Sequence, residues 1–319
     1  MRKVTESEII HYLKFGRLNP KQVVIPIGDD AALLELDNTR VVICKDISVE
    51  GTHFLRNTDP FNIARRSVLV NVSDLAAMAA IPKYILLGLT LPTAYANEKW
   101  VKRFSKGLHS VLDEFDMHLI GGDVTKGKLN VSVTLIGEEF IESRSLKRSD
   151  MLPDDNIYVT GTLGDAAAGL KLLKSKTATK GSDYKYLVDR YIDPNPRIEL
   201  AKRIAPFARG VIDVSDGLLN ELQILSKQSN CGVSVDTSLI PTSKSLRTVA
   251  GKNFIELALN GGDDYEILFA APPSEQKAIE KISQTLKLPI SLIGTAVSKK
   301  GININGLDSG IKIKSFRHF

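Results

Sequence analysis

Short apolar runs with the length of buried strands recur along the chain, and segments with helical spacing of apolar residues separate them. The predicted strands cover residues 41–44, 84–91, 117–120, 129–140, 157–160, 210–214, 266–270 and 290–297. Besides the helix described next, the predicted helices cover residues 97–114, 163–173, 197–205, 218–229 and 274–286. This mixture indicates an α/β or α+β protein with two layered domains, and propensity alone leaves both sheet types open.

One predicted helix is marked at both of its ends. Asp59 can cap it, and Pro60 then takes the first helical position, where a missing N–H is tolerated. Apolar residues recur at helical spacing over residues 63–78. We therefore expect a helix to about Ala80, ended by Pro82.

The character of the chain changes around residues 141–155, where charged and turn-forming residues end in Leu152-Pro153-Asp154-Asp155. A length of 319 residues suits two domains of roughly 100–200 residues each. We place the boundary here, so that residues 1–145 form an N-terminal domain and residues 146–319 a C-terminal domain.

The composition is that of a globular protein with buried cores, since 43% of the residues are apolar and 25% are charged. The formal net charge is +5, but the basic residues are scattered, with tight pairs at Arg65-Arg66 and Lys299-Lys300. Because nucleic-acid binding needs a concentrated basic face, we expect no nucleic-acid partner. A mild positive charge suits an anionic small-molecule substrate equally well.

Cysteine usage and hydropathy argue against two further classes of protein. Cys44 and Cys231 are too few for a disulfide framework. No apolar stretch follows Met1-Arg2-Lys3 as in a signal peptide, and none reaches the ~18 residues of a membrane span. We expect a cytoplasmic protein without a membrane partner.

Aspartate stands beside glycine unusually often in this sequence, mostly at the end of an apolar run. The turn preference of both residue types explains any one of these motifs. Six together indicate a shared role, because clustered carboxylates repel each other and a hard divalent cation relieves the repulsion. Mg²⁺ shares carboxylates with substrate phosphates, so we expect several Mg²⁺ ions bridging phosphates. The motifs are Ile27-Gly28-Asp29-Asp30, Lys45-Asp46, Ser73-Asp74, Gly121-Gly122-Asp123, Asp213-Val214-Ser215-Asp216-Gly217 and Gly261-Gly262-Asp263-Asp264.

The spacing within two of these motifs bears on which aspartates can bind metal. Asp213 and Asp216 stand three apart at a predicted helix start, so both fall on one face if the helix begins there. Asp29 and Asp30 are adjacent, so in an extended segment they point to opposite sides. Only one of that pair is expected to serve the site.

Other signatures of nucleotide binding or catalysis are absent or weak. Neither a GxxxxGK[ST] loop nor a GxGxxG motif occurs in the sequence. Residues 161–165 could place backbone N–H groups near an anion, but tight packing of the Ala-rich helix that follows explains them better. His53 follows Asp46 by seven residues, and the sequence pattern leaves its role open. No Ser/His/Asp or Cys/His arrangement stands out.

The order of the motifs resembles one protein family from about Gly28 to the C-terminal aromatic residues. The matching segments are residues 27–33, 46–54, 71–78, 121–123, 161–165, 213–218 and 262–266. In this order they are similar to thiamine-monophosphate kinase, of the aminoimidazole-ribonucleotide synthetase superfamily. The resemblance implies direct transfer of a phosphate group from ATP to thiamine monophosphate, with several Mg²⁺ ions. It also implies a homodimer paired through the N-terminal domains, which would bind ATP and Mg²⁺.

The resemblance further implies a role for each matched residue. The metal ligands would be Asp30, Asp46, Asp74, Asp123, Asp213 and Asp216. The ATP contacts would be Gly122, Arg148 and Ser215, and the catalytic residues Asp46, Asp216 and Arg148. The substrate contacts would be His53, Asp263 and Phe316. The C-terminal domain would complete the active site.

The sequence departs from the family at three places. Cys44-Lys45 stands where Ser or Thr is usual, and a protonated lysine cannot bind a metal ion. Either one Mg²⁺ is lost and Lys45 supplies its positive charge, or Lys45 points away. Asp263 replaces the usual Glu, which shortens its reach by one methylene and would weaken substrate contact. Ala80 stands where Gly is common, and a helix end tolerates it.

Two alternative functions follow from the same features. Another ATP-using synthetase of the superfamily would share the motifs, although a selenophosphate synthetase needs a reactive cysteine near the N-terminus that neither cysteine here provides. A non-catalytic nucleotide- or thiamine-binding protein would explain the departures at Lys45 and Asp263.

Overall fold

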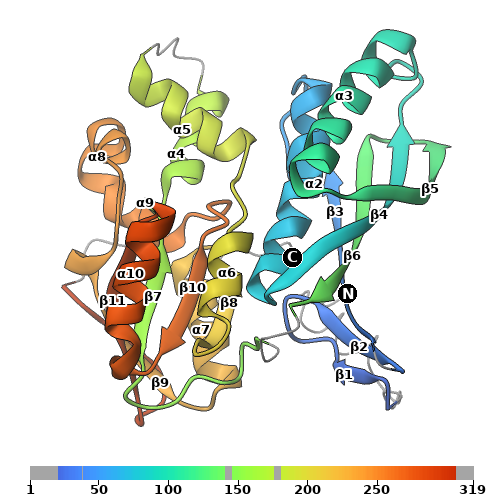
Figure 1. Cartoon of the computed structure of the whole chain (residues 1–319). Coiled ribbons are helices and arrows are strands. Elements are labelled where there is room, and N and C mark those ends of the chain that lie inside the picture. The colour runs from blue at the N-terminus through green and yellow to red at the C-terminus, as the bar shows by residue number, and fades with distance from the viewer. Residues whose placement is uncertain (1–20, 38, 141–145, 176–180, 307–319) are drawn as a thin grey trace, which may run out of the picture.

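The structure, a computed structural model, describes residues 21–37, 39–140, 146–175 and 181–306. These residues form two six-stranded sheets with helices packed against them (Figure 1). Strands and helices are mixed in both halves of the chain, which confirms the predicted fold class. No helix in these described ranges is long and apolar enough to cross a membrane.

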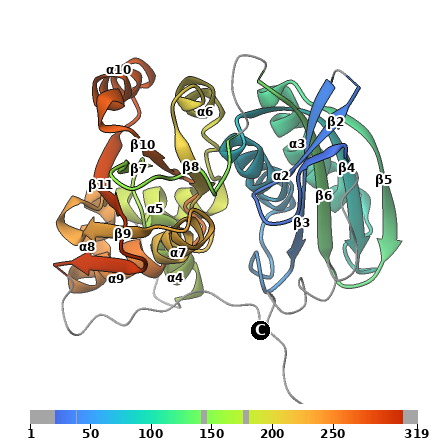
Figure 2. The ribbon, with the colours of Figure 1, turned by 90° about the horizontal axis from the view of Figure 1, so that it is seen from below.

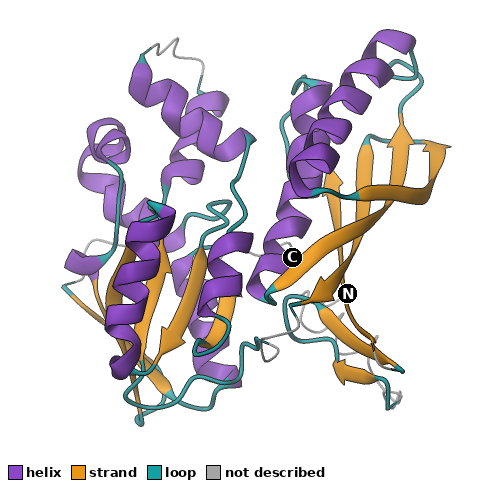
Figure 3. Ribbon diagram, viewed as in Figure 1, coloured by secondary structure: helices purple, strands orange, loops and turns teal. Residues whose placement is uncertain are grey.

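The first sheet lies in the N-terminal half and has one face covered by helices. Helices α2 (Pro60–Ala77) and α3 (Glu98–Phe115) lie between this sheet and the second half of the chain (Figure 2). The outer face of the sheet carries no helix from the described part of the chain (Figure 3). The strands are β1 (Val23–Ile25), β2 (Ala32–Leu36), β3 (Thr39–Val49), β4 (Ala80–Leu91), β5 (His118–Lys126) and β6 (Asn130–Glu139).

The strand order of the first sheet is β1-β2-β3-β6-β4-β5, so β5 is an edge strand. Neighbouring strands are antiparallel except β4 and β5, which are parallel. All the residues of β5 are exposed. The motif Gly121-Gly122-Asp123 therefore lies inside a strand, because the strand predicted to end at residue 120 continues to Lys126.

The second sheet has the order β12-β9-β11-β7-β10-β8. Its strands are β7 (Asn156–Thr160), β8 (Arg209–Asp213), β9 (Gly232–Asp236), β10 (Ile267–Ala271), β11 (Ile290–Val297) and β12 (Ile302–Asn305). The helices of this half are α4 (Asp165–Lys174), α5 (Ser182–Ile192), α6 (Ile198–Ile204), α7 (Leu218–Gln228), α8 (Lys244–Ala250), α9 (Phe254–Asn260) and α10 (Gln276–Leu286). Three short 3₁₀ segments also occur, at Thr237–Leu239, Gly251–Asn253 and Pro273–Glu275.

Both faces of the second sheet are buried, because successive residues of a strand point to opposite faces. In β7, Tyr158 packs in the same cluster as Ile198 of α6 and Ile279 of α10. Its neighbour Ile157 packs in a second cluster with Leu218 of α7. The two helical layers explain the nearly continuous apolar strands of this half.

Helix α2 begins as its sequence predicts. The carboxylate of Asp59 accepts a hydrogen bond from the Phe61 N–H at 2.8 Å, and Pro60 is the first helical residue. The helix ends at Ala77, and Ala79 adopts a left-handed φ of 52° that turns the chain into β4. The expectation that Pro82 ends the helix is therefore wrong. Pro82 lies inside β4 at an irregular point of its pairing with β6, where a missing N–H is tolerated.

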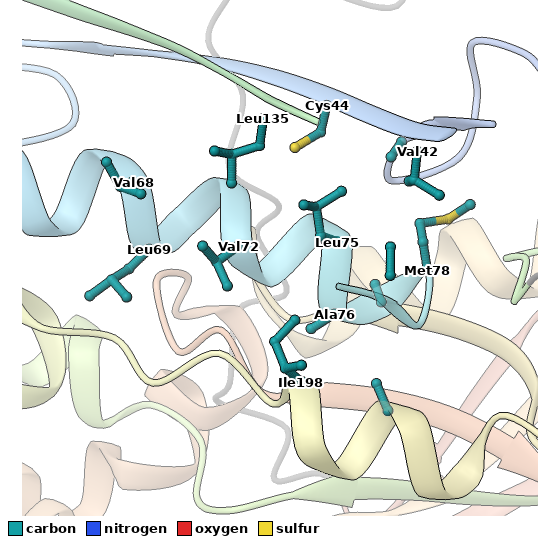
Figure 4. Packing of buried hydrophobic residues seen from close by; sticks show 14 of the residues in the cluster. Val42, Cys44, Val68, Leu69, Val72, Leu75, Ala76, Met78, Leu135 and Ile198 are labelled. Atoms are coloured by element: carbon teal, nitrogen blue, oxygen red, sulfur yellow. The ribbon is translucent and has the colours of Figure 1, made fainter. Parts of the chain in front are cut away.

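Helix α2 is buried from both sides and joins the two halves. Val42, Cys44 and Leu135 of the first sheet pack on one side of it, and Ile198 of α6 packs on the other (Figure 4). A single buried cluster therefore extends from the first sheet through α2 to the second sheet. The two sheets lie on either side of the predicted boundary at residues 145 and 146, and that boundary stays a prediction.

Several elements carry no clear periodic signal in the sequence. Strands β1, β2, β9 and β12 and helices α5, α8 and α9 were not predicted. The four strands and the helices α8 and α9 are short, so few of their positions must be apolar, whereas α5 is as long as the predicted helix α7. The two cysteines are buried and unbridged, as expected.

The crossing of α2 and α3 depends on Gly107. A Cβ at this position would lie 2.2 Å from the backbone oxygen of Phe61, so the helices would have to separate. We expect Gly107→Ala to lower the free energy of unfolding by about 1–3 kcal/mol, the usual cost of overpacking. Urea denaturation measures the change, with the exposed neighbour substitution Lys106→Ala as the control. Equal midpoints for Gly107→Ala and wild type would show that the crossing adjusts freely.

Candidate active site

Three carboxylates from distant parts of the sequence meet at the seam between the two halves. Asp30 lies in the loop between β1 and β2, Asp74 on α2, and Asp213 at the end of β8. One oxygen of each lies within 4.8 Å of the other two. The loop, the helix and the strand end thus build the cluster that the sequence motifs suggested.

Helix α2 holds this cluster together through two polar side chains. The Ser73 hydroxyl donates a 2.6 Å hydrogen bond to the Asp213 carboxylate. The Asn71 side-chain oxygen accepts a 3.0 Å hydrogen bond from the Asp46 N–H, which fixes β3 beside the helix. Ser73 and Asn71 are buried, so neither contact has to compete with bulk water.

The cluster is electrostatically unfavourable as a set of ionised carboxylates. Burial raises the pKa of Asp74 well above its usual range, and the neighbouring Asp46 and Asp213 raise it further. Burial likewise raises the pKa of Asp213, and repulsion from Asp30 adds to the effect. Converging, crowded carboxylate oxygens of this kind are a donor set that fits a hard divalent cation such as Mg²⁺.

Arg148 provides positive charge beside the cluster. Its Nε and Nη2 atoms donate to the two Asp30 oxygens at 3.1 and 2.6 Å, a two-pronged pairing suited to a guanidinium. Its backbone N–H donates to Asp29 at 3.2 Å. Asp29, whose pKa burial raises to about 6, therefore serves the backbone, while Asp30 faces the cluster. This agrees with the expectation that only one of the pair serves the site.

Two loops of the second half complete this region. Gly262 allows close approach, because a Cβ there would lie 2.4 Å from the Ser215 backbone oxygen. The same oxygen accepts a 2.7 Å hydrogen bond from the Asp263 N–H. The Asp216 N–H donates to Glu221 at 3.0 Å, and burial raises the pKa of Glu221 to about 8.

The condition that would place Asp213 and Asp216 on one helical face is not met. The helix that follows begins at Leu218, after Gly217, rather than at the aspartates. Asp213 is the last residue of β8, and Asp216 lies in the turn between them. Their spacing therefore does not place them on one helical face, although Asp213 still reaches the cluster.

The comparisons with known proteins show the family of this chain. Residues 28–138 match the N-terminal domain of AIR synthase related proteins, and residues 153–306 match the C-terminal domain. The chain is 38% identical to the thiamine-monophosphate kinase of Salmonella typhimurium over 320 residues, which cover 98% of this chain and 97% of that one. The chain belongs to the thiamine-monophosphate kinase family.

Solved structures of similar proteins support the same conclusion. The thiamine-monophosphate kinase of Stenotrophomonas maltophilia has a TM-score of 0.80 and 37% identity, with 94% of this chain and 95% of that chain covered. A structure described as AaThiL complexed with AMPPCP and TMP has a TM-score of 0.88 and 31% identity, with 100% and 99% covered.

The family departure at Lys45 is resolved by the alternation of β3. Cys44 and Asp46 share the face toward α2, so Lys45 points to the opposite face of the sheet. There its Nζ donates to the hydroxyl of Ser132 at 2.6 Å. Of the two alternatives, the structure selects the second, in which Lys45 points away from the aspartates.

Gly122 and Asp123, which match the family motif, are not brought to the cluster by this chain. They lie on edge strand β5, which β4 and β6 separate from β3. Asp123 shares a row with Gly88, Ser132 and Ile47, on the sheet face that Lys45 occupies. The glycine also has a local reason, because a Cβ at Gly122 would lie 1.9 Å from a backbone oxygen of β4.

The two described family residues expected to contact the substrate lie near one arginine. His53 Nδ1 accepts a 3.0 Å hydrogen bond from the Val49 N–H. Asp263 accepts a hydrogen bond from the Arg66 guanidinium at 2.5 Å. The same guanidinium donates to the His53 backbone oxygen at 3.4 Å. Phe316, the third expected contact, lies outside the described residues.

The loop before α4 has a structural role, in line with the preferred explanation of that motif. The carboxylate of Asp264 accepts hydrogen bonds from the N–H groups of Gly164 and Ala166 at 2.6 and 3.1 Å. A Cβ at Gly169 would lie 2.1 Å from the Leu187 backbone oxygen, so α4 and α5 pack closely.

Sequence reasoning missed several polar residues that shape the site: Arg66, Asn71, Ser73 and Glu221. A signal existed for Arg66, because it stands three residues after Ile63 and so shares the buried side of the predicted helix. A charge at such a position needs a buried partner. The partner itself lies about two hundred positions away along the chain, so the sequence alone could not name it.

Stability should report on the cluster through pH and cation binding. Without added cation, we expect the melting temperature to fall as the pH rises from about 5 to 8. The carboxyl pKa values are higher in the folded protein than in the unfolded chain, so the unfolded chain loses these protons first and gains in relative stability as the pH rises. The raised pKa values of about 6 for Asp29 and about 8 for Glu221 set this window. Mg²⁺ at ~100 times its Kd should then raise the melting temperature at pH 8 by on the order of 5 °C.

Differential scanning calorimetry in chelator and in Mg²⁺ measures both effects. Asp213→Asn should flatten the pH slope and reduce the gain from Mg²⁺, whereas the exposed Asp113→Asn should behave as wild type. A melting temperature that ignores Mg²⁺ at pH 8 would count against a cation at the cluster.

Proposed function

We propose that this protein transfers the γ-phosphoryl group of ATP to thiamine monophosphate, giving ADP and thiamine diphosphate. The observation that carries the proposal is the convergence of Asp30, Asp74 and Asp213 beside Arg148, in a chain of this family. The similar structure described with AMPPCP, an analogue of ATP, and TMP supports both ligands. Localisation in the cytoplasm and the absence of a nucleic-acid partner stay predictions.

The reaction needs no general base to activate the acceptor. The second pKa of a phosphate monoester is near 6, so the acceptor oxygen is largely ionised at neutral pH. This oxygen forms a bond to the γ-phosphorus of ATP as the bond to the bridging oxygen breaks. The electron pair of that bond leaves with ADP. Positioning and charge stabilisation then supply nearly all of the catalysis.

Positive charge is the requirement that the site must meet, because donor and acceptor are both polyanions. Mg²⁺ held by Asp30, Asp46, Asp74, Asp213 and Asp216 would neutralise the charge on the phosphate oxygens. Arg148 lies beside the cluster with Nε and Nη2 paired to Asp30, so its guanidinium would have to release Asp30 in order to bind phosphate oxygens. The number of cations stays part of the proposal.

The acceptor side has its own donors. Because the His53 Nδ1 accepts the Val49 N–H, a neutral imidazole carries its proton on Nε2. That N–H is suited to an anionic acceptor. Asp263, in a loop against Ser215, would contact the same substrate, and Ser215 would contact ATP. Lys45 points away from the aspartates, so it gives no reason to favour a non-catalytic binding protein over an enzyme.

The reaction is tested by incubating the purified protein with ATP, Mg²⁺ and thiamine monophosphate and measuring thiamine diphosphate by chromatography. We expect product that depends on all three. Asp46→Asn should lower kcat by roughly a hundredfold or more while the melting curve stays cooperative, because transition-state charge stabilisation is lost. The exposed Asp113→Asn is the matched control. No product from the wild-type protein at saturating substrate would reject the proposal.

A homodimer paired through the first sheet is the second part of the proposal. The sheet face away from α2 exposes Ile47, Tyr84 and Leu86, which are 47%, 40% and 38% exposed. Large apolar side chains on a sheet face mark an interaction surface, and a two-fold dimer would cover the same patch on both copies. Asp123 and Gly122 lie at the edge of that face, so a second copy could receive them into its site.

Subunit mixing tests whether Asp123 acts across the dimer. Asp123→Asn and Asp46→Asn should each be inactive as homodimers. Co-expressed in equal amounts, they should recover about a quarter of wild-type activity, because half of the dimers then contain one intact site of two. No recovery in verified mixed dimers would place Asp123 in its own chain's site or outside the reaction.

A further inference from the structure

Arg66 is a buried cation on α2 whose partners come from three separate segments. Its side chain is 7% exposed. Nη2 donates to Asp263 at 2.5 Å, Nη1 donates to the Tyr191 backbone oxygen, and Nε donates to the His53 backbone oxygen at 3.4 Å. The guanidinium also lies 4.3 Å from the centre of the Tyr191 ring. Each nitrogen of the guanidinium therefore donates one hydrogen bond to a fixed acceptor.

Two of these three partners belong to the acceptor side of the proposed reaction. Asp263 and His53 are the two described residues expected to contact thiamine monophosphate. Tyr191 strengthens the same arrangement, because its hydroxyl donates to the His53 backbone oxygen at 3.1 Å. Arg66 and Tyr191 thus connect a loop of the first half with a loop of the second half at the place where they must act together.

The backbone of the second loop needs such support. Asp263 and Tyr265 have left-handed φ values of 73° and 51°, which non-glycine residues rarely adopt. Strained conformations of this kind persist where the surroundings fix them. The Asp263 and Tyr265 N–H groups bond the backbone of residues 214 and 215, and Arg66 fixes the carboxylate end.

The length of the side chains matters here. Asp263 is one methylene shorter than the glutamate usual in the family, so its carboxylate stays closer to its own backbone. The long guanidinium of Arg66 spans that gap from α2. A lysine would keep the charge but lose the fork that serves a carboxylate and two carbonyls at once.

We propose that Arg66, with Tyr191 against it, is the positioning residue of the acceptor subsite, which orients Asp263 and the His53 loop toward thiamine monophosphate. The proposal rests on the kinase function proposed above. Arg66 acts through its neighbours and contacts no reacting atom. Its removal should therefore change the use of the acceptor much more than the use of ATP.

Steady-state kinetics of the full-length protein separates these effects. Arg66→Lys should raise the KM for thiamine monophosphate about tenfold, the loss expected for a hydrogen bond to a charged group, with the KM for ATP within about twofold of wild type. Tyr191→Phe should raise the same KM by a smaller factor. Arg66→Lys/Asp263→Glu should return it to within about threefold of wild type, because the longer acid restores contact with the shorter base.

The neighbouring Arg65→Lys is the matched control. Arg65 also joins the two halves, through Asp193 at 2.8 Å, but its side-chain partners Asp193, Ser110 and Glu114 are not substrate residues. A wild-type KM for thiamine monophosphate in both Arg66→Lys and Tyr191→Phe, or equal rises in both KM values without rescue by Asp263→Glu, would overturn the positioning role. A wild-type protein that forms no thiamine diphosphate would instead reject the kinase function.

Discussion

Repulsion among buried carboxylates is the constraint on which this structure depends. Asp30, Asp74 and Asp213 come from three segments that only the folded chain brings together, and their close approach is unfavourable in the absence of positive charge. Arg148 offsets part of it, and burial raises the pKa of Asp74 and of Asp213, which favours their neutral forms. A site of this kind gains most from ligands that bring cations, as a nucleotide with its Mg²⁺ does.

Helix α2 converts that constraint into an organised site. One helix carries Arg66, Asn71, Ser73 and Asp74 within nine positions. Their side chains bond or face the Asp263 loop, β3, the end of β8 and the Asp30 loop. The acceptor residues and the aspartate cluster are therefore fixed to the same rigid rod. A rigid element holds a site more accurately than separate loops can.

Local signals made much of this molecule predictable from its sequence. The cap at Asp59 and the proline after it predicted the start of α2, because capping depends on neighbours in the chain. The repeated aspartates indicated a cation site by residue type, although only the folded chain brings Asp30, Asp74 and Asp213 together. The direction of the Lys45 side chain follows from the alternation of side chains along one strand. Asp123 was harder, because its placement depends on the strand order of the sheet, which no local pattern encodes. Arg66 needed a partner from the other half.

The continuous core around α2 also affects whether the two halves of the chain can fold separately. Ile198 of the second half packs on a helix that belongs to the first, and both lie in one buried cluster (Figure 4). A cut at the predicted boundary would leave an apolar surface exposed on each fragment. The halves are thus folding partners rather than exchangeable modules, and a chimera that joins one half to a distant relative would have to preserve the shape of this shared surface.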